Sequence, residues 1–175
     1  MKHQKQKLKK NEQRDKVLPA DSIFVPPVVE AVMNTFTMMI QVEPRIGRLR
    51  FKSDEVARGA VTGLLKMEGE TINGSVSITF TLPVVIDIVL RMLRMDILEV
   101  DDIARDMSGE LANIVVGGAK NLLEAKGYNI SMSLPEVFAG EGHHIKHYFK
   151  GKTIEIPFSI DSGDFFVEVN FQEQG

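Results

Sequence analysis

Apolar residues recur every three or four positions along several stretches of the chain, a spacing that predicts amphipathic helices. One such helix is expected over residues 25–43, because it begins beside a pair of prolines and stops before another proline. A second is expected over residues 101–126, and Gly127 follows at the position where helices commonly end. Residues 84–93 are almost continuously apolar, with one narrow polar stripe, which predicts a largely buried helix.

Alternating apolar and polar residues predict antiparallel strands between these helices. Six segments are expected to contain strands: 45–52, 61–70, 75–80, 129–139, 154–160 and 165–171. Asn73-Gly74 predicts the tight turn of a first hairpin, whose returning strand buries only one face. A second hairpin turns at residues 161–164. Pro157 lies within its pattern and indicates a sheet edge or a bulge.

The order of these elements repeats along the chain, as helix, strands and hairpin, with a further helix between the two copies. Hairpins separated by helices favour an α+β fold over a parallel sheet. We therefore predict a duplicated helix-plus-antiparallel-strands unit that forms a single domain over residues 17–175. Residues 1–16 hold seven Lys or Arg against two acidic residues, a net charge of +5. We expect this basic tail to be a disordered, solvated extension.

Composition excludes several classes of function. The chain of 175 residues has no cysteine, which excludes disulfide frameworks, thiolate metal sites and cysteine nucleophiles. Its net charge of −3 leaves −8 on residues 17–175, and this negative charge repels the phosphate backbone of a nucleic acid. The basic tail has no aromatic residue on which a base could stack. No apolar run reaches the ~20 residues of a membrane span and no secretory signal is evident. We expect a cytoplasmic protein that binds neither nucleic acid nor membrane.

Three histidines near residue 145 raise the question of a metal site. His143, His144 and His147 lie beside glycines, and imidazole is a common metal ligand. A polar loop is the alternative, and it is favoured because no matched carboxylate spacing such as HExxH accompanies them.

The second long helix carries the residues most suggestive of chemistry. Glu110 and Asn113 are three positions apart, so they are neighbours on one helix face, and Asp106 and Gly117 continue the same flank. Gly117 and Gly118 each cost a helix ~1 kcal/mol relative to alanine, which suggests that a neighbour approaches closely. This flank could simply be solvated, with the glycines packed against another helix. Alternatively Glu110 and Asn113 meet a partner, where a carboxylate can hold a cation and an amide can orient a water.

The string Asp106-xxx-Glu110-xx-Asn113-xxx-Gly117 resembles the signature of the CheC/CheX/FliY phosphatase family of bacterial chemotaxis. These proteins hydrolyse the aspartyl phosphate of the response regulator CheY. The surrounding GELANIVVGGAKNLLEAKG and the following ISMSLPEVFAG are similar to the CheX type. The resemblance covers about residues 24–171 and implies a two-layer CheC-like fold with pseudo-two-fold symmetry. It also implies a homodimer that pairs through strands.

The resemblance implies roles for the residues of the motif. Glu110 would pair with the response regulator's lysine and Asn113 would orient a water for attack on the acyl phosphate. Asp106 and Gly117 would contact the partner. The partner would bring its own Mg²⁺, so we expect no metal and no cofactor bound by this chain itself.

CheC-like members carry the ExxN motif in both repeats, and this chain departs from that pattern. In the first helix Met33 stands three positions after Glu30, so we expect one site per chain and a structural or solvated Glu30. The same fold also resembles the middle domain of the flagellar switch protein FliM, a non-enzymatic interaction module. A pure scaffold would not need Glu110 and Asn113 on one exposed flank, which favours the phosphatase.

Overall fold

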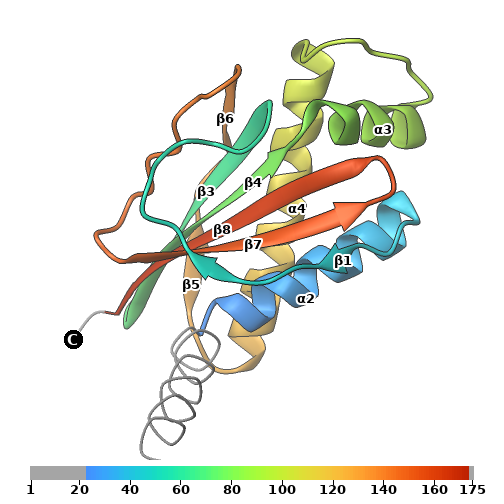
Figure 1. The fold of residues 1–175 in the computed structure, drawn as a ribbon. Coiled ribbons are helices and arrows are strands. Elements are labelled where there is room, and N and C mark those ends of the chain that lie inside the picture. The colour runs from blue at the N-terminus through green and yellow to red at the C-terminus, as the bar shows by residue number, and fades with distance from the viewer. Residues whose placement is uncertain (1–22, 174–175) are drawn as a thin grey trace, which may run out of the picture.

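A computed structural model describes residues 23–173, which form one eight-stranded antiparallel sheet with helices packed against one of its faces (Figure 1). The elements in chain order are α2 (Val25–Thr35), a π-helical turn η1 (Phe36–Ile40), β1 (Arg45–Ile46), β2 (Arg50–Phe51), β3 (Val61–Gly69), β4 (Ile72–Phe80), α3 (Leu82–Leu93), α4 (Asp102–Ala125), β5 (Ile130–Met132), β6 (Glu136–Ala139), β7 (Lys152–Ile160) and β8 (Gly163–Glu173). The α+β class is thus confirmed, whereas the expected tail over residues 1–16 lies outside the described residues. Within residues 23–173 no helix is both long and apolar enough to cross a bilayer.

Two long hairpins form the centre of the sheet. The β3–β4 hairpin and the β7–β8 hairpin lie side by side because β4 pairs with β8, giving the order β1-β7-β8-β4-β3-β5. The short strands β1 and β2 pair with β7, and β5 and β6 pair with β3. Each half of the chain therefore supplies short strands to the other half's hairpin. This exchange is the arrangement that a duplicated unit would give, while the two-fold symmetry stays a prediction.

The core fills the space between the sheet and the helices. Its centre is an aromatic stack in which Phe165 of β8 lies between Phe36 and Phe158, with ring centroids 4.5 and 5.1 Å away. Helix α4 lies close against β3, because a Cβ atom at Gly63 would come within 2.7 Å of the Cβ atom of Ala112. The closeness of this contact fixes the outward face of α4 relative to the sheet.

The first hairpin differs from the prediction in its turn and in its burial. Asn73 and Gly74 lie inside β4, where they pair with β8, and the chain turns at residues 70–71 instead. The polar side of β4 is also buried, including Ser75, Ser77 and Thr79. The reason is that two segments cover the sheet face that the helices leave open. Segment 52–60 bonds to it through Lys52, and segment 140–151 bonds to it through His143 and His147.

Pro157 marks a break between two ladders and not an open edge. Strand β7 pairs with β8 on one side and with β1 and β2 on the other. The carbonyl oxygen of Pro157 accepts a hydrogen bond of 2.7 Å from the amide of Gly47. Because the N–H and C=O of one residue point to the same side of an antiparallel strand, the N–H that proline lacks would point into the gap between β1 and β2.

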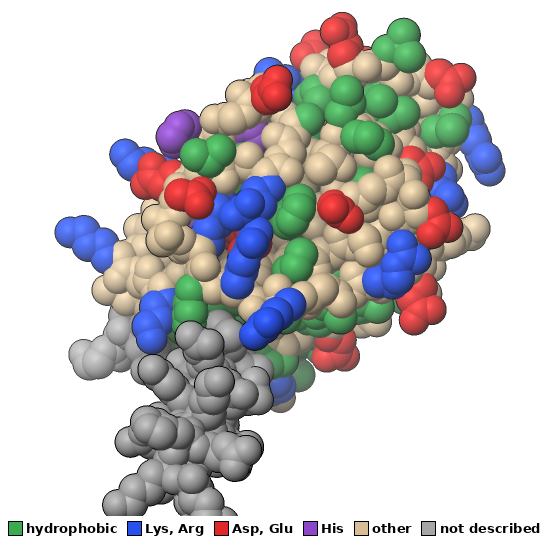
Figure 2. Space-filling view, in the orientation of Figure 1, with side chains coloured by type: hydrophobic (Ala, Val, Ile, Leu, Met, Phe, Trp, Pro, Cys, Tyr) green, Lys and Arg blue, Asp and Glu red, His purple; other side chains and the backbone are tan. Residues whose placement is uncertain are grey.

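Helix α3 is less buried than its composition predicted. Its inner face holds Val84, Val85, Ile88 and Val89. Leu90 and Leu93 are exposed, however, and so are Met95 and Leu98 in the connection to α4. Figure 2 shows hydrophobic side chains gathered at the end of the molecule where α3 lies in Figure 1.

Candidate functional site

The motif residues lie together on the outward face of α4. Asp106 and Glu110 are exposed, and Asn113 and Gly117 are partly exposed. At 3.6 residues per turn these four positions span about 60° of the helix circumference. The opposite face, with Ser108, Leu111 and Val115, is buried towards the sheet. The structure therefore brings together the four residues that the spacing grouped.

The polar groups of this face are free to meet a partner. Among residues 23–173, no hydrogen bond or ion pair engages the side chain of Glu110 or of Asn113. The helix is stabilised elsewhere, by the Asp101 carboxylate that accepts a bond of 2.9 Å from the amide of Ala104 and by the Lys120–Glu124 ion pair. Hence neither Glu110 nor Asn113 is needed to cap or to clamp the helix.

The two adjacent glycines of α4 have different surroundings. A Cβ atom at Gly118 would lie 3.3 Å from the Cβ atom of Ala31, so this glycine permits close packing of α4 against α2. A Cβ atom at Gly117 would meet no atom within 4 Å. Intramolecular packing therefore explains Gly118, while nothing within the described part of the chain requires glycine at 117.

Helix α2 lacks an equivalent constellation. Glu30 and Asn34 are exposed there, but Met33 occupies the position that asparagine has in the motif. The side chain of Met33 packs against the hydrophobic core. The position at which α2 departs from the motif therefore contributes to core packing and not to an exposed polar pair.

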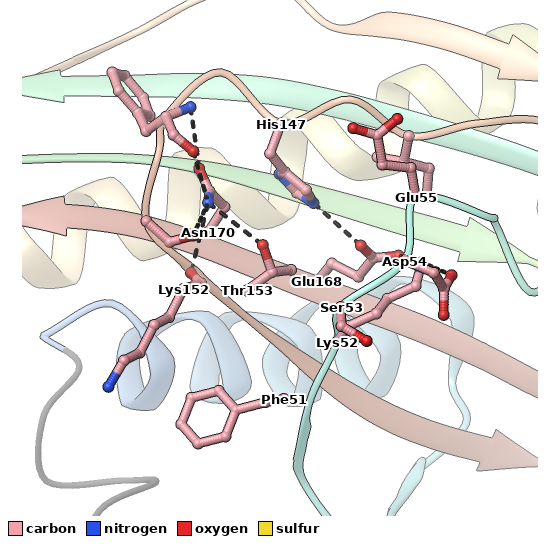
Figure 3. Close-up of a pocket in the computed structure, with 13 residues that line it drawn as sticks. Phe51, Lys52, Ser53, Asp54, Glu55, His147, Lys152, Thr153, Glu168 and Asn170 are labelled. Carbon is pink, nitrogen blue, oxygen red and sulfur yellow. Dashed lines mark hydrogen bonds and ion pairs between the residues drawn. The ribbon is translucent and has the colours of Figure 1, made fainter.

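The other face of the sheet contains a polar pocket of about 480 Å³ that sequence reasoning missed (Figure 3). In it Lys52 Nζ lies 2.7 Å from Glu168 Oε2, and both side chains are almost fully buried. His147 bridges Ser75 Oγ and Glu168 Oε1 at 2.7 and 3.2 Å. The Asn170 amide bonds the backbone of Phe149 in both directions. These polar groups form hydrogen bonds and an ion pair with one another. They hold segments 52–60 and 140–151 against the sheet, and few of their polar atoms remain available to bind a ligand.

Two histidines of segment 140–151 contribute to the contacts that hold this segment against the sheet. The carbonyl of Gly140 can only accept, so His143 donates to it from Nδ1 at 2.6 Å, and His143 Nε2 lies 2.6 Å from the hydroxyl of Thr62. His144 is exposed. No group of three potential metal-ligating side chains occurs within residues 23–173. His143 and His147 thus hold the loop against the sheet through hydrogen bonds.

The sequence and fold match known proteins along most of the chain. The family model described as "Chemotaxis phosphatase CheX" matches residues 61–159. A curated relative from Thermotoga maritima, named CheY-P phosphatase CheX, is 26% identical over 148 residues, which cover 83% of this chain and 93% of that protein. The solved structure of the chemotaxis protein CheX from Vibrio vulnificus is 38% identical, covers 86% of this chain and 100% of its own, and has a TM-score of 0.80.

A third match is a CheX–CheY–BeF₃–Mg²⁺ complex from Borrelia burgdorferi. It covers 86% of this chain and 98% of that one, with a TM-score of 0.73. At 22% identity this likeness shows the fold alone. The family model covers more than half of the chain, and the structural relative from Vibrio vulnificus exceeds 30% identity. The chain therefore belongs to the CheX family of chemotaxis phosphatases.

Proposed function

We propose that this phosphatase hydrolyses the aspartyl phosphate of a CheY-like response regulator, and that the outward face of α4 is where it does so. The observation that carries the proposal is the pair formed by Glu110 and Asn113. Their side chains stand next to each other on a helix whose other faces are packed into the fold, and neither has a hydrogen-bond or ion-pair partner among residues 23–173. The relative from Thermotoga maritima is named for activity on CheY-P, which supports the choice of substrate.

Glu110 is suited to docking. Its exposed carboxylate can accept a hydrogen bond from a lysine ammonium of the response regulator. A charge-assisted bond of this kind stabilises a complex by about 1.5–3 kcal/mol when the interface excludes water. Because this carboxylate has no polar partner in the described part of the chain, it gives up no hydrogen bond or ion pair there when it binds.

Asn113 is suited to positioning the attacking water. Its amide oxygen can accept a hydrogen bond from the water while its NH₂ group donates to a phosphoryl oxygen. The water oxygen attacks phosphorus opposite the aspartyl oxygen, and the P–O bond to that oxygen breaks. The aspartate leaves as a carboxylate, and inorganic phosphate is released with the protons of the water. Positioning and electrostatics dominate such reactions, so no base and no metal of this chain is required; Mg²⁺ belongs to the regulator.

Two further positions complete the proposed contact face. Gly117 leaves open space one turn beyond Asn113, which allows the regulator's backbone to approach the helix closely. Asp106, one turn before Glu110, adds a second exposed carboxylate. A scaffold without activity would have no use for an amide positioned in this way.

We further propose that the protein is a cytoplasmic homodimer. Its sheet ends in the short strands β1 and β2 on one side and β5 and β6 on the other. Such edges present unpaired peptide groups, and pairing with a second copy satisfies them. Ile46 of β1 and Phe51 of β2 are exposed apolar residues at one of these edges.

The test uses the full chain and the CheY-like regulator of the same genome, phosphorylated with a small phosphodonor that is then removed. Loss of regulator phosphate is followed over time with wild type and with the double variant Glu110→Ala/Asn113→Ala. We expect wild type at catalytic amounts to accelerate the loss and the double variant to leave it at the spontaneous rate. Equal rates for a folded double variant and wild type would exclude this face as the site. No acceleration by wild type would exclude the function.

A further inference from the structure

Leu134 is a large apolar residue held out into solvent in the turn between β5 and β6. Its exposed fraction is 85%, and among the large hydrophobic residues of the described chain only Leu98 is more exposed, at 90%. A single exposed leucine is ordinary and by itself indicates nothing. Leu134 differs in the rigidity of its turn and in the surface that this turn borders.

The turn that carries Leu134 is fixed on both sides. Ser133 donates its amide to the carbonyl of Lys66, and Ser133 Oγ accepts from the amide of Lys66, each at 2.9 Å. The next residue, Pro135, has a fixed φ and restricts the backbone of Leu134. Strands β5 and β6, which flank the turn, both pair with β3. The backbone of Leu134 is thus ordered before any partner arrives, which lowers the entropy lost on binding.

This turn borders the outward face of α4. A Cβ atom at Gly109 would lie 2.9 Å from Val137 Cγ2 and 3.8 Å from Pro135 Cγ. Gly109 directly precedes Glu110 and lies one helical turn before Asn113 on the same side. The segment that holds Leu134 therefore packs against α4 immediately beside the two residues of the proposed site.

We propose that Leu134 is an apolar docking residue for the phosphorylated response regulator, inserting into an apolar depression beside the regulator's aspartyl phosphate. This inference rests on the function proposed above. The occupant follows from continuity: a protein surface that reaches both Glu110 and Asn113 also covers the turn next to them. The three side chains then have different roles. Leu134 supplies apolar area that is buried on binding, Glu110 supplies a negative charge, and Asn113 positions the attacking water.

A docking residue that does not touch the reacting atoms has a recognisable kinetic signature. Its contact is the same in the ground state and in the transition state, so its loss raises KM and leaves kcat nearly unchanged. Removing a leucine side chain from a desolvated interface weakens binding by about 10- to 100-fold. Asn113 should show the opposite pattern, because its amide acts on the attacking water.

The experiment compares Leu134→Ala and Leu134→Asp with wild type and with the matched control Leu98→Asp. The control introduces the same charge at an equally exposed leucine, one that precedes α4 and lies more than two helical turns from Glu110. Two quantities are measured: the Kd for the CheY-like regulator loaded with BeF₃⁻ and Mg²⁺, and the dephosphorylation rate against regulator concentration. We expect about tenfold weaker binding for Leu134→Ala, a larger loss for Leu134→Asp, an unchanged kcat, and wild-type behaviour for Leu98→Asp.

Each outcome separates this inference from the proposed function. If wild type binds and dephosphorylates the regulator and both Leu134 variants match it, the inference is wrong and the function stands. If wild type neither binds nor acts on the regulator, the function fails first. Sedimentation velocity of each variant tests the remaining alternative, that Leu134 contacts a second copy of this chain. A Leu134→Asp protein that is monomeric where wild type is dimeric would assign Leu134 to a contact between copies, which also overturns the inference.

Discussion

Glu155 and Glu168 face each other across the β7–β8 ladder, and both carboxylates are buried. Like charges at opposed positions of a sheet repel each other. Each carboxylate is bonded to its own basic residues: Arg50 and Arg58 for Glu155, Lys52 and His147 for Glu168. The repulsion is thereby offset by Arg50 of β2 and by basic residues of the two segments, 52–60 and 140–151, that cover this face. The opposed pair consequently fastens those segments to the sheet, on the side away from α4.

Breaking one of these buried pairs should destabilise the protein strongly. Lys52→Met leaves the Glu168 carboxylate buried with only His147 beside it, and we expect a loss of about 3–5 kcal/mol in the free energy of unfolding. The double variant Lys52→Met/Glu168→Met removes both charges and should lose less than Lys52→Met alone. Urea denaturation measures both. Arg45→Met is the control: its pair with Asp161 is exposed, so the loss should stay below about 1 kcal/mol. Equal losses for Lys52→Met and Arg45→Met would contradict the role of burial.

The sequence predicted those elements whose pattern is set by near neighbours. Helix α4 and the β7–β8 hairpin appear where periodicity and turn residues indicated them. The turn expected at Asn73-Gly74 was wrong because pairing with β8 extends β4 backwards through both residues. The burial of Ser75 was missed for a similar reason, since its cover comes from His147, 72 positions along the chain. Local patterns carry no information on contacts of that range.

The candidate site likewise contains residues that could be predicted from the sequence and one that could not. Glu110 and Asn113 could be grouped from the sequence because an i, i+3 spacing on a helix already fixes their proximity. Leu134 could not be assigned to the same surface from the sequence, because the position of its turn beside Gly109 depends on the pairing of β5 and β6 with β3. The exposure of Leu90 on α3 was equally hidden, because an apolar run does not reveal which of its faces the fold leaves uncovered.

Gly117 and Gly118 should respond in opposite ways to substitution. At Gly117 an added Cβ meets nothing within 4 Å, so Gly117→Ala should raise the free energy of unfolding by up to about 1 kcal/mol through helix propensity. Gly118→Leu must fit against Ala31 of α2 and should lower it by about 1–3 kcal/mol. Thermal or urea unfolding compares the two. Gly117→Leu should remain folded and lose activity on the phosphorylated regulator, because its side chain blocks the approach to Asn113; full activity would show that no partner comes close to this position.

A homodimer should be visible at micromolar concentration. The chain has a mass of 19.5 kDa, so light scattering or sedimentation should give about twice that value. If the edge at β1 and β2 forms the contact, Ile46→Lys should shift the equilibrium towards the monomer, because a charge at an edge strand opposes pairing. Leu98→Lys, at an exposed position between α3 and α4, is the control. A species of only about 19 kDa for wild type would remove the dimer.

Glu110 and Asn113 should be separable by measuring binding and turnover independently. Glu110→Ala removes the charge-assisted contact to the regulator's lysine and should weaken binding of the BeF₃⁻-loaded regulator about 10- to 100-fold, with a parallel loss in kcat/KM. Asn113→Ala should bind nearly as wild type does, yet turn over about two orders of magnitude more slowly, the scale seen when one positioned polar group is lost. Neither variant should lower stability, because neither side chain has a hydrogen-bond or ion-pair partner within residues 23–173 and alanine favours a helix.

Glu30→Ala is the internal control for these two variants, since Glu30 is an exposed helical glutamate like Glu110 but has Met33 where the motif has asparagine. It should leave both binding and turnover unchanged. Circular dichroism of each variant confirms that the fold is kept. Wild-type turnover by a folded Asn113→Ala protein would refute the positioning of water by this amide. A loss on Glu30→Ala equal to that on Glu110→Ala would instead place a second functional face on α2.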